Sequence, residues 1–251
     1  MILHKVLIFF SILFIFSCKT EKKTDNSVMN LKISAFTESQ QFPDASISSM
    51  QYTDGNFVFG LSNYTLGLQT PDAQQKMCAN SSQGQHIHLI VDNKPYEAKY
   101  DSAFHYFIPD GDHYILAFLS RSYHESIKNK TAFVIMNATI KDSTIANVKP
   151  VTEPMLFYSR PKGKYVGDET KKVMLDFYLV NCSLGTNYKV KAEINGSSQI
   201  FDKWEPVYLE GLPMGENSIK LSLIDSAGNL VNTALNPVER KFTLLDDPLK
   251  K

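Results

Sequence analysis

The sequence predicts an all-β protein built from two tandem immunoglobulin-like β-sandwiches. Apolar and polar residues alternate with a period of two in several short segments, a pattern typical of strands that bury one face and expose the other. Turn-forming pairs separate these segments, among them Asp54-Gly55, Asp110-Gly111 and Asn195-Gly196. Short alternating strands bounded by such turns are the usual sequence pattern of a β-sandwich.

The N-terminus precedes these strands and has the layout of an export signal. Lys5 supplies a positive charge, residues 6–16 are almost entirely apolar, and the small residue Ser17 stands directly before Cys18. This layout predicts a signal peptide over residues 1–17. The cysteine makes it a lipoprotein signal, because its thiol accepts diacylglycerol before the peptide is cut on the N-terminal side.

The lipid on Cys18 is the expected membrane anchor. The apolar run of 11 residues is too short for a spanning helix, which needs about 20. Residues 18–29, the lipidated cysteine and a polar stretch, are expected to form a disordered tether. The expected location is the outer membrane of the cell envelope. A plain secreted protein, in which Cys18 is incidental, is the alternative.

Strand patterns occur in both halves of the chain. Residues 31–36, 188–194 and 219–224 alternate between apolar and polar side chains, which predicts strands with one wet face. Residues 114–119 and 132–136 are continuous apolar runs, and such runs predict strands that are covered on both sides. No segment has the periodicity of a long helix.

A weak internal repeat predicts where one sandwich ends and the next begins. Residues 108–119 match residues 212–223 at an offset of 104 residues, which is about the length of one immunoglobulin-like domain. We therefore expect a first domain over residues 30–142 and a second over residues 152–246. Residues 145–150 are expected to form a short connection between them.

The charge balance and the cysteines restrict the partners. After residues 1–17 are removed, 25 basic residues stand against 26 acidic ones, so no basic surface for nucleic acid is expected. Cys78 and Cys182 are the only cysteines besides Cys18. Export permits a disulfide between them, but their positions in different halves make two free thiols an equal alternative.

Histidines concentrate in the first predicted domain. The chain after residue 17 has five histidines within 39 residues: His86, His88, His105, His113 and His124. In a strand, His86 and His88 point to the same face about 6–7 Å apart, where two imidazoles can share one ion. His113 and His124 are candidates to complete that site if their strands are neighbours. Imidazole suits copper and zinc, so the expected ion is Cu or Zn.

The same segment resembles a family of small periplasmic domains of unknown function. Residues 84–92 read GQHIHLIVD and residues 110–116 read DGDHYIL. The family has a His-x-His-Leu-Leu-Ile strand, then a Gly-x-His-x-Leu strand and a later histidine. The resemblance covers residues 84–124 and carries over the positions of His86, His88, His113 and His124, but the family has no established activity. The first domain as a whole also resembles lipoproteins of the Bacteroidota that have immunoglobulin-like domains and no assigned activity.

Each candidate residue also has a second interpretation. A polar residue that opens a strand often ties down a corner by bonding backbone groups, and Asn217 takes the place of His113 in the second repeat. His86 and His88 alternatively line an exposed strand face or a groove. Arg121 and Tyr123 are candidates for ligand binding, because binding residues are often placed on loops held by a rigid scaffold.

The sequence contains no recognisable catalytic motif. It has no Gly-x-Ser-x-Gly elbow, no phosphate-binding glycine loop and no His-Glu-x-x-His, so an enzyme is not expected. The predicted function is that of a membrane-anchored, non-catalytic ligand-binding lipoprotein whose His-rich strand face binds Cu or Zn. The alternative is a structural or protein-interaction lipoprotein without a metal site. Expected partners are the membrane, through the lipid, and an envelope protein, a peptide or a metal ion.

Overall fold

The computed structural model describes residues 30–249 of the chain. Within this range it contains 17 strands and two short 3₁₀ helices, so the predicted all-β class is confirmed. Neither helix in this range has the length or the apolar character that a bilayer span requires. The predicted signal peptide over residues 1–17 and the predicted lipidated tether over residues 18–29 lie outside the described residues.

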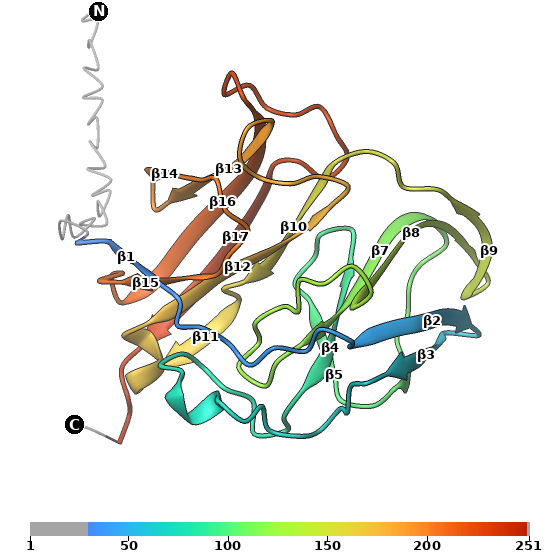
Figure 1. The fold of residues 1–251 in the computed structure, drawn as a ribbon, viewed down its shortest axis with the longest axis horizontal. Coiled ribbons are helices and arrows are strands. Elements are labelled where there is room, and N and C mark those ends of the chain that lie inside the picture. The colour runs from blue at the N-terminus through green and yellow to red at the C-terminus, as the bar shows by residue number, and fades with distance from the viewer. Residues whose placement is uncertain (1–29, 250–251) are drawn as a thin grey trace, which may run out of the picture.

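Two sheets come from the N-terminal half of the chain (Figure 1). One has three strands in the order β2 (Ser46–Thr53), β3 (Asn56–Ser62) and β6 (Ala103–His105). The other has five strands in the order β5 (Glu97–Lys99), β4 (His86–Val91), β7 (Gly111–Ser120), β8 (Phe133–Lys141) and β9 (Thr144–Lys149). All neighbouring strands in both sheets are antiparallel. The short helix η1 (Ala73–Gln75) lies between β3 and β4 in the chain.

Two further sheets contain the strands of the C-terminal half. The four-stranded sheet has the order β1 (Lys32–Ala35), β15 (Val207–Glu210), β12 (Val173–Val180) and β10 (Met155–Arg160). The five-stranded sheet has the order β11 (Gly163–Val166), β17 (Val238–Leu245), β16 (Gly215–Asp225), β13 (Tyr188–Ile194) and β14 (Ser197–Phe201). Among the strands of residues 30–249, β11 and β17 are the one pair of neighbours that run in parallel. The helix η2 (Gly167–Thr170) follows β11.

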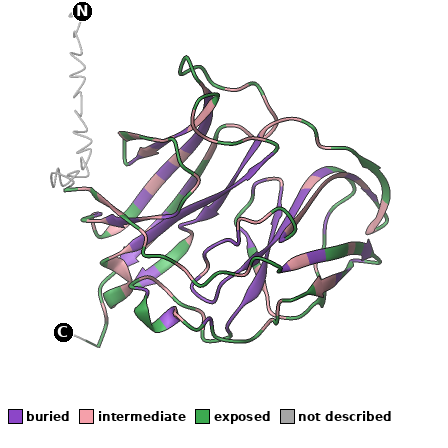
Figure 2. Cartoon of the chain, viewed as in Figure 1, coloured by how far each residue is buried: buried purple, intermediate pink, exposed green. Residues whose placement is uncertain are grey.

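Each pair of sheets encloses one apolar core. Phe57, Ile87 and Ile115 lie in the core of the N-terminal half, and all three are fully buried. Leu175 and Leu221 lie in the core of the C-terminal half. Alternation of buried and open residues along single strands, visible in Figure 2, follows the period-two pattern of the sequence. The immunoglobulin-like topology of the two halves stays a prediction.

A third apolar cluster joins the two halves. Ile90 and Phe118 come from β4 and β7, and Phe157 and Tyr178 come from β10 and β12. The strands β4, β10 and β12 are therefore buried along their whole length. The continuous apolar run over residues 114–119 is likewise covered on both sides, as predicted. One face of such a strand packs in the core of its own half, and the other face packs against the other half. A continuous apolar run in this chain therefore indicates a strand at the junction between the halves.

Strand β1 pairs with the opposite half from the one that the sequence predicted. The predicted first domain begins at residue 30, whereas Ile33 and Ala35 of β1 pair with Leu209 and Val207 of β15. Figure 1 shows β1 beside β15, away from β2. The alternation over residues 31–36 predicts a strand, but it carries no information about the partner strand, which tertiary packing selects.

The two cysteines in the described range are unpaired. Burial raises the pKa of Cys78 to about 11 and the pKa of Cys182 to about 11. Both side chains are therefore protonated thiols at neutral pH, and of the two alternatives left open by the sequence the structure has free thiols.

Candidate metal centre

The strand β4 places His86 and His88 on the face that meets the C-terminal half. Its odd-numbered residues, Ile87 and Leu89, enter the core of the N-terminal half. Because side chains alternate along a strand, the even-numbered residues point the other way, together with Ile90 of the junction cluster. Both imidazoles are fully buried, with 0% of their surface exposed.

His124 reaches the same place from the loop that follows β7. The loop is closed by two backbone hydrogen bonds, from the Arg121 amide to the Glu125 carbonyl (2.9 Å) and from the His124 amide to the Arg121 carbonyl (2.8 Å). His124 has a φ of 68°, a left-handed conformation that is uncommon for residues other than glycine. This tight turn folds the loop back, and its histidine lies over β4.

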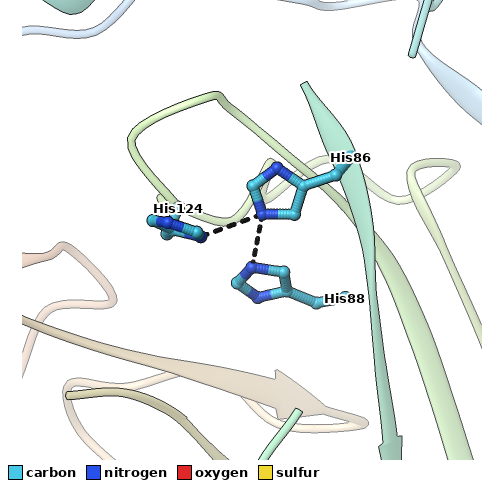
Figure 3. A group of neighbouring side chains, drawn as sticks. All are labelled: His86, His88 and His124. Carbon is cyan, nitrogen blue, oxygen red and sulfur yellow. Dashed lines mark hydrogen bonds between the residues drawn. The ribbon is translucent and has the colours of Figure 1, made fainter. Parts of the chain in front are cut away.

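The three imidazoles meet at their ring nitrogens (Figure 3). His86 Nε2 lies 2.8 Å from His88 Nε2 and 3.0 Å from His124 Nδ1. One ring nitrogen from each residue lies within 4.8 Å of the other two. The predicted site residues His86, His88 and His124 are therefore brought together.

The contacts of His86 fix which of its nitrogens carries the proton. Its Nδ1 lies 2.8 Å from the Gly84 carbonyl oxygen, which can only accept, so Nδ1–H donates and Nε2 carries the lone pair. A single in-plane lone pair faces two neighbouring ring nitrogens and can accept a good hydrogen bond from only one. An ion between the three rings would accept all three lone pairs, and a backbone carbonyl behind a ligating ring is the usual support for such a ligand.

The surroundings hold the three imidazoles in the neutral form. Burial lowers the pKa of His86 to about 4, although the hydrogen bond to the Gly84 carbonyl acts in the opposite direction, and the Arg160 and Lys162 charges lower the pKa further. Burial is also the main reason why the pKa values of His88 and His124 lie well below the usual 6.5. Only a neutral imidazole has a lone pair to give to a metal, so each of the three rings has one lone pair to offer at neutral pH.

The C-terminal half completes the surroundings of the site. Arg160 Nη1 donates to the Tyr96 hydroxyl (2.8 Å), and the Tyr96 ring stacks on His88 with centroids 3.6 Å apart. Burial raises the pKa of Tyr96 to about 12, so its hydroxyl keeps a proton, and that hydroxyl lies 3.2 Å from His124 Nδ1. Ser159 Oγ is 3.4 Å from His88 Nδ1.

This donor set is suited to a transition metal that prefers nitrogen. At a metal–nitrogen distance of about 2.0–2.1 Å and tetrahedral angles, two ligating nitrogens lie roughly 3.3 Å apart. The observed 2.8 and 3.0 Å lie close to that spacing. The complete set of three nitrogens lies within 4.8 Å, so the rings would have to move together for all three to reach one ion. No carboxylate belongs to the group within residues 30–249, and Arg160 and Lys162 add positive charge. The site therefore favours an ion with high intrinsic affinity for imidazole, and Cu(II) exceeds Zn(II) in that respect.

His113 does not join the three other histidines. Its Nδ1 lies 2.6 Å from Asp92 Oδ2 and its Nε2 lies 2.9 Å from the Pro109 carbonyl oxygen, so both ring nitrogens already have partners. It also stands five residues before Phe118, the register partner of His88, which places it roughly 16 Å away along β7. Because five is an odd number, the side chains of His113 and Phe118 lie on opposite faces of β7.

Arg121 and Tyr123 are directed into the protein. Arg121 is 4% exposed, and its Nε and Nη2 donate to the Gln40 carbonyl at 2.9 and 2.7 Å. Tyr123 is fully buried, and its hydroxyl donates to Asp72 Oδ2 (3.1 Å). Both side chains attach the loop to neighbouring segments, so the geometry gives the predicted ligand-binding role no support.

Sequence reasoning did not find Tyr96, Ser159, Arg160 and Lys162 as neighbours of the site. Tyr96 belongs to a chain rich in tyrosine, with 12 in all, and the other three lie in the C-terminal half, which has no histidine. No local pattern signals their approach, because the junction between the halves brings them to β4.

Comparisons with known proteins give no family for this chain. No protein-family model matches it, and no curated protein matches it. Among solved structures, the fibronectin(III)-like modules of CbhA from Clostridium thermocellum are similar at a TM-score of 0.28 and 14% identity, over 37% of this chain and 99% of that one.

Two bacterial adhesin structures are also similar. One is a 1.5-MDa ice-binding adhesin, with a TM-score of 0.21 and 8% identity over 86% of this chain and 64% of that one. The other is a Ca²⁺-stabilized adhesin of an Antarctic bacterium that binds ice, with a TM-score of 0.21 and 10% identity over 86% of this chain and 49% of that one. Likeness at these scores carries no inference about what this chain binds.

Proposed function

We propose that this chain is a non-catalytic lipoprotein of the cell envelope that binds one copper or zinc ion through His86, His88 and His124. The observation that carries the proposal is the convergence of three neutral imidazole nitrogens within 4.8 Å. Isolated buried histidines are normally satisfied by hydrogen bonds to different partners. Here three histidines direct ring nitrogens at one point, and the lone pair of His86 Nε2 faces two of them. This is the arrangement expected of a set of metal ligands.

The burial of the site supports binding without catalysis. A catalytic metal keeps one coordination position open to water and substrate. Here His86 and His88 are fully buried, and only His124 is partly exposed. Such enclosure suits an ion that is stored or that fastens two layers of the protein together.

The N-terminal sequence supports the location. The apolar run before Ser17-Cys18 is the basis for proposing export, lipidation at Cys18 and an outer-membrane anchor. Export matters for the ion, because a protein outside the cytoplasm meets metals that the cytoplasm sequesters. The proposed partners are therefore the membrane, through the lipid, and the ion.

A structural role without metal is the second candidate. It is favoured by Arg160 and Lys162, whose positive charges act on the imidazoles and oppose a bound cation. In that role the three rings would simply fill the junction next to Tyr96 and Phe118, which both contact His88. The two candidates differ in one measurable quantity, the affinity for an added ion.

Calorimetric titration of the metal-free full chain in detergent tests the proposal. We expect saturable binding of one Cu(II) ion per chain, weaker binding of Zn(II), and loss of both in the double variant His86→Gln with His88→Gln. The matched control is His105→Gln, which changes an exposed histidine. Electron paramagnetic resonance of the wild-type Cu(II) complex should show coupling to three nitrogens. Absence of saturable heat from the wild-type chain with either ion would leave the structural role.

A further inference from the structure

We propose that a groove at the junction of the two halves binds a carboxylate-bearing oligosaccharide. The groove has a volume of about 590 Å³, within the range of roughly 300–1,000 Å³ that is typical of ligand clefts, which form preferentially between domains. Its walls come from both halves, with Lys130 and Phe133 on one side and Asn187, Tyr188 and Trp204 on the other. The inference is independent of the metal site.

Aromatic rings supply the apolar part of the lining. Phe133, Tyr188 and Trp204 are all half-buried, so each has part of its surface open to solvent. Two contacts hold Trp204 in place. Its Nε1–H donates to the Phe177 carbonyl (2.8 Å), and its ring packs edge-to-face with the Tyr178 ring, with centroids 5.0 Å apart. A ring that is fixed before binding loses little conformational freedom when a ligand stacks on it.

Uncharged polar side chains stand beside the rings. Asn187 and Ser183 are exposed in the groove, and within the described residues neither side chain has a hydrogen-bond partner in the protein. A sugar ring matches this combination, because its C–H face stacks on the negative face of an aromatic ring while its hydroxyls bond amide and hydroxyl groups. A purely apolar ligand would displace water from Asn187 and Ser183 without replacing those hydrogen bonds.

The charge of the lining selects an acidic sugar. Two lysines line the groove, and no Asp or Glu of the described chain does. Asp176 Oδ1 lies 2.7 Å from Lys128 Nζ and neutralises it. Lys130 is exposed and forms no ion pair within residues 30–249, so its charge is available to a ligand carboxylate. An extended peptide is disfavoured, because peptides that bind sandwiches usually pair with a free strand edge, whereas loop side chains form most of this lining.

Trp204 makes the test direct, because it is the only tryptophan in the chain. We would titrate the full chain with tetragalacturonate and with the neutral maltotetraose and follow Trp204 fluorescence. EDTA is present throughout to keep metal out of the histidine site, because a continuous series of ring contacts joins Trp204 to His88 through Tyr178 and Phe118. We expect a saturable change with tetragalacturonate at a Kd below about 1 mM, and affinity for maltotetraose roughly tenfold lower.

Matched variants assign the binding to this groove. Lys130→Gln should weaken tetragalacturonate binding roughly tenfold, and Asn187→Ala should weaken both sugars, whereas Lys141→Gln, an equal charge change at the far end of β8, should have no effect. Both groove residues are exposed, so these variants are expected to fold, which circular dichroism checks. No saturable change at millimolar tetragalacturonate, equal affinity for the neutral sugar, or equal effects of Lys130→Gln and Lys141→Gln would each overturn the proposal.

Discussion

His113 and Asn217 hold equivalent corners of the two halves. His113 Nε2 lies 2.9 Å from the Pro109 carbonyl, and Asn217 Nδ2 donates to the Pro213 carbonyl at 2.9 Å. The equivalence extends to a neighbouring residue in each half. Asp92 forms a hydrogen bond with His113, and Asn195 forms one with Asn217. The internal repeat in the sequence therefore corresponds to a repeated hydrogen-bonded corner, and His113 belongs to that corner.

Substitution of His113 should lower the stability of the protein without changing its affinity for metal. His113→Ala should lower the free energy of unfolding by about 1–2 kcal/mol, because it removes two hydrogen bonds from a buried position. His113→Asn should retain most of the stability, since Asn217 performs the same role. Urea denaturation measures both variants. Metal affinity should be unchanged in each, and a loss of affinity in His113→Asn would place His113 in the metal site after all.

The metal-free protein should begin to lose stability near pH 6.5, which is a higher pH than the one at which carboxylates begin to be protonated. The pKa of His86 is about 4 in the folded chain and near 6.5 when unfolded, so the unfolded state binds more protons between these values. Stability is therefore complete above pH 6.5 and falls as the pH drops toward 4, by about 3 kcal/mol from His86 alone. His88 and His124 add to the fall in the same direction.

Urea denaturation at several pH values checks this expectation. The slope of stability against pH between 6.5 and 4.5 should be smaller in His86→Gln than in the wild-type chain. His105→Gln, which changes an exposed histidine, should keep the wild-type slope. A wild-type chain whose stability is flat over this interval would contradict the lowered pKa values.

Copper affinity should persist to unusually low pH. An ordinary imidazole is about one-tenth neutral at pH 5.5, so three such ligands lose roughly a thousandfold in affinity between pH 7.5 and 5.5. The lowered pKa values of His86, His88 and His124 keep these rings neutral over that interval. Competition with a chelator should show less than about a tenfold loss. A histidine-rich peptide is the reference, and an equally steep loss in both would refute the prediction.

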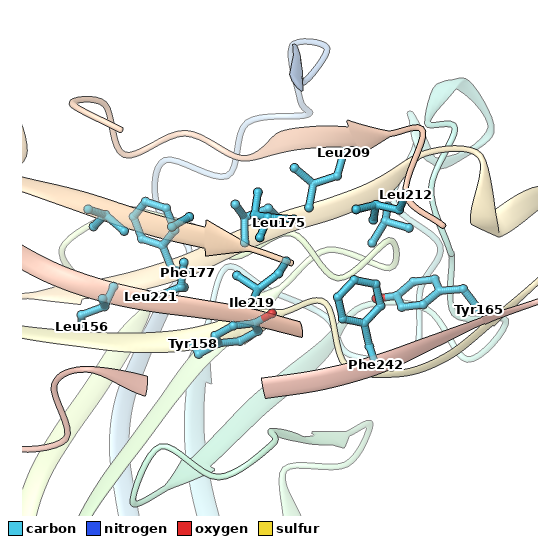
Figure 4. Packing of buried hydrophobic residues seen from close by; sticks show 14 of the residues in the cluster. Leu156, Tyr158, Tyr165, Leu175, Phe177, Leu209, Leu212, Ile219, Leu221 and Phe242 are labelled. Atoms are coloured by element: carbon cyan, nitrogen blue, oxygen red, sulfur yellow. The ribbon is translucent and has the colours of Figure 1, made fainter. Parts of the chain in front are cut away.

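The C-terminal half should not be fully stable by itself. A fragment of residues 152–246 lacks β1, which pairs with β15, although it keeps most of the core in Figure 4. It also exposes Phe157 and Tyr178, which the N-terminal half covers. The sequence repeat predicts that this half is an independent domain. The structure shows that it depends on the rest of the chain for β1 and for the cover over Phe157 and Tyr178. We expect aggregation or dye binding typical of exposed apolar surface, and a monomeric fragment with full amide dispersion in its NMR spectrum would argue for independence.

Lipidation at Cys18 is tested by a single substitution. Cys18→Ser should abolish incorporation of labelled fatty acid and leave the precursor uncleaved, because the lipid is attached to the thiol. Cys78→Ser is the matched control and should be labelled like the wild type, since Cys78 lies among the described residues far along the chain. Label in the Cys18→Ser protein would disprove the anchor.

The sequence alone determined those features that depend on local periodicity. Alternation predicted strands in both halves, and it placed His86 and His88 on one face, because side chains two apart on a strand point the same way. The repeat at an offset of 104 residues also anticipated the corner role of His113, which was one of the two interpretations of that residue.

Only the tertiary structure decided which elements meet. The left-handed turn at His124 brings that ring to β4, while strand register sends His113 to the opposite face and far end of β7. Arg160 approaches the site, and β1 joins the C-terminal half, through contacts between residues more than 60 positions apart. Periodicity is a property of neighbours in the chain, whereas packing of the two halves selects these partners, so no local pattern could predict them.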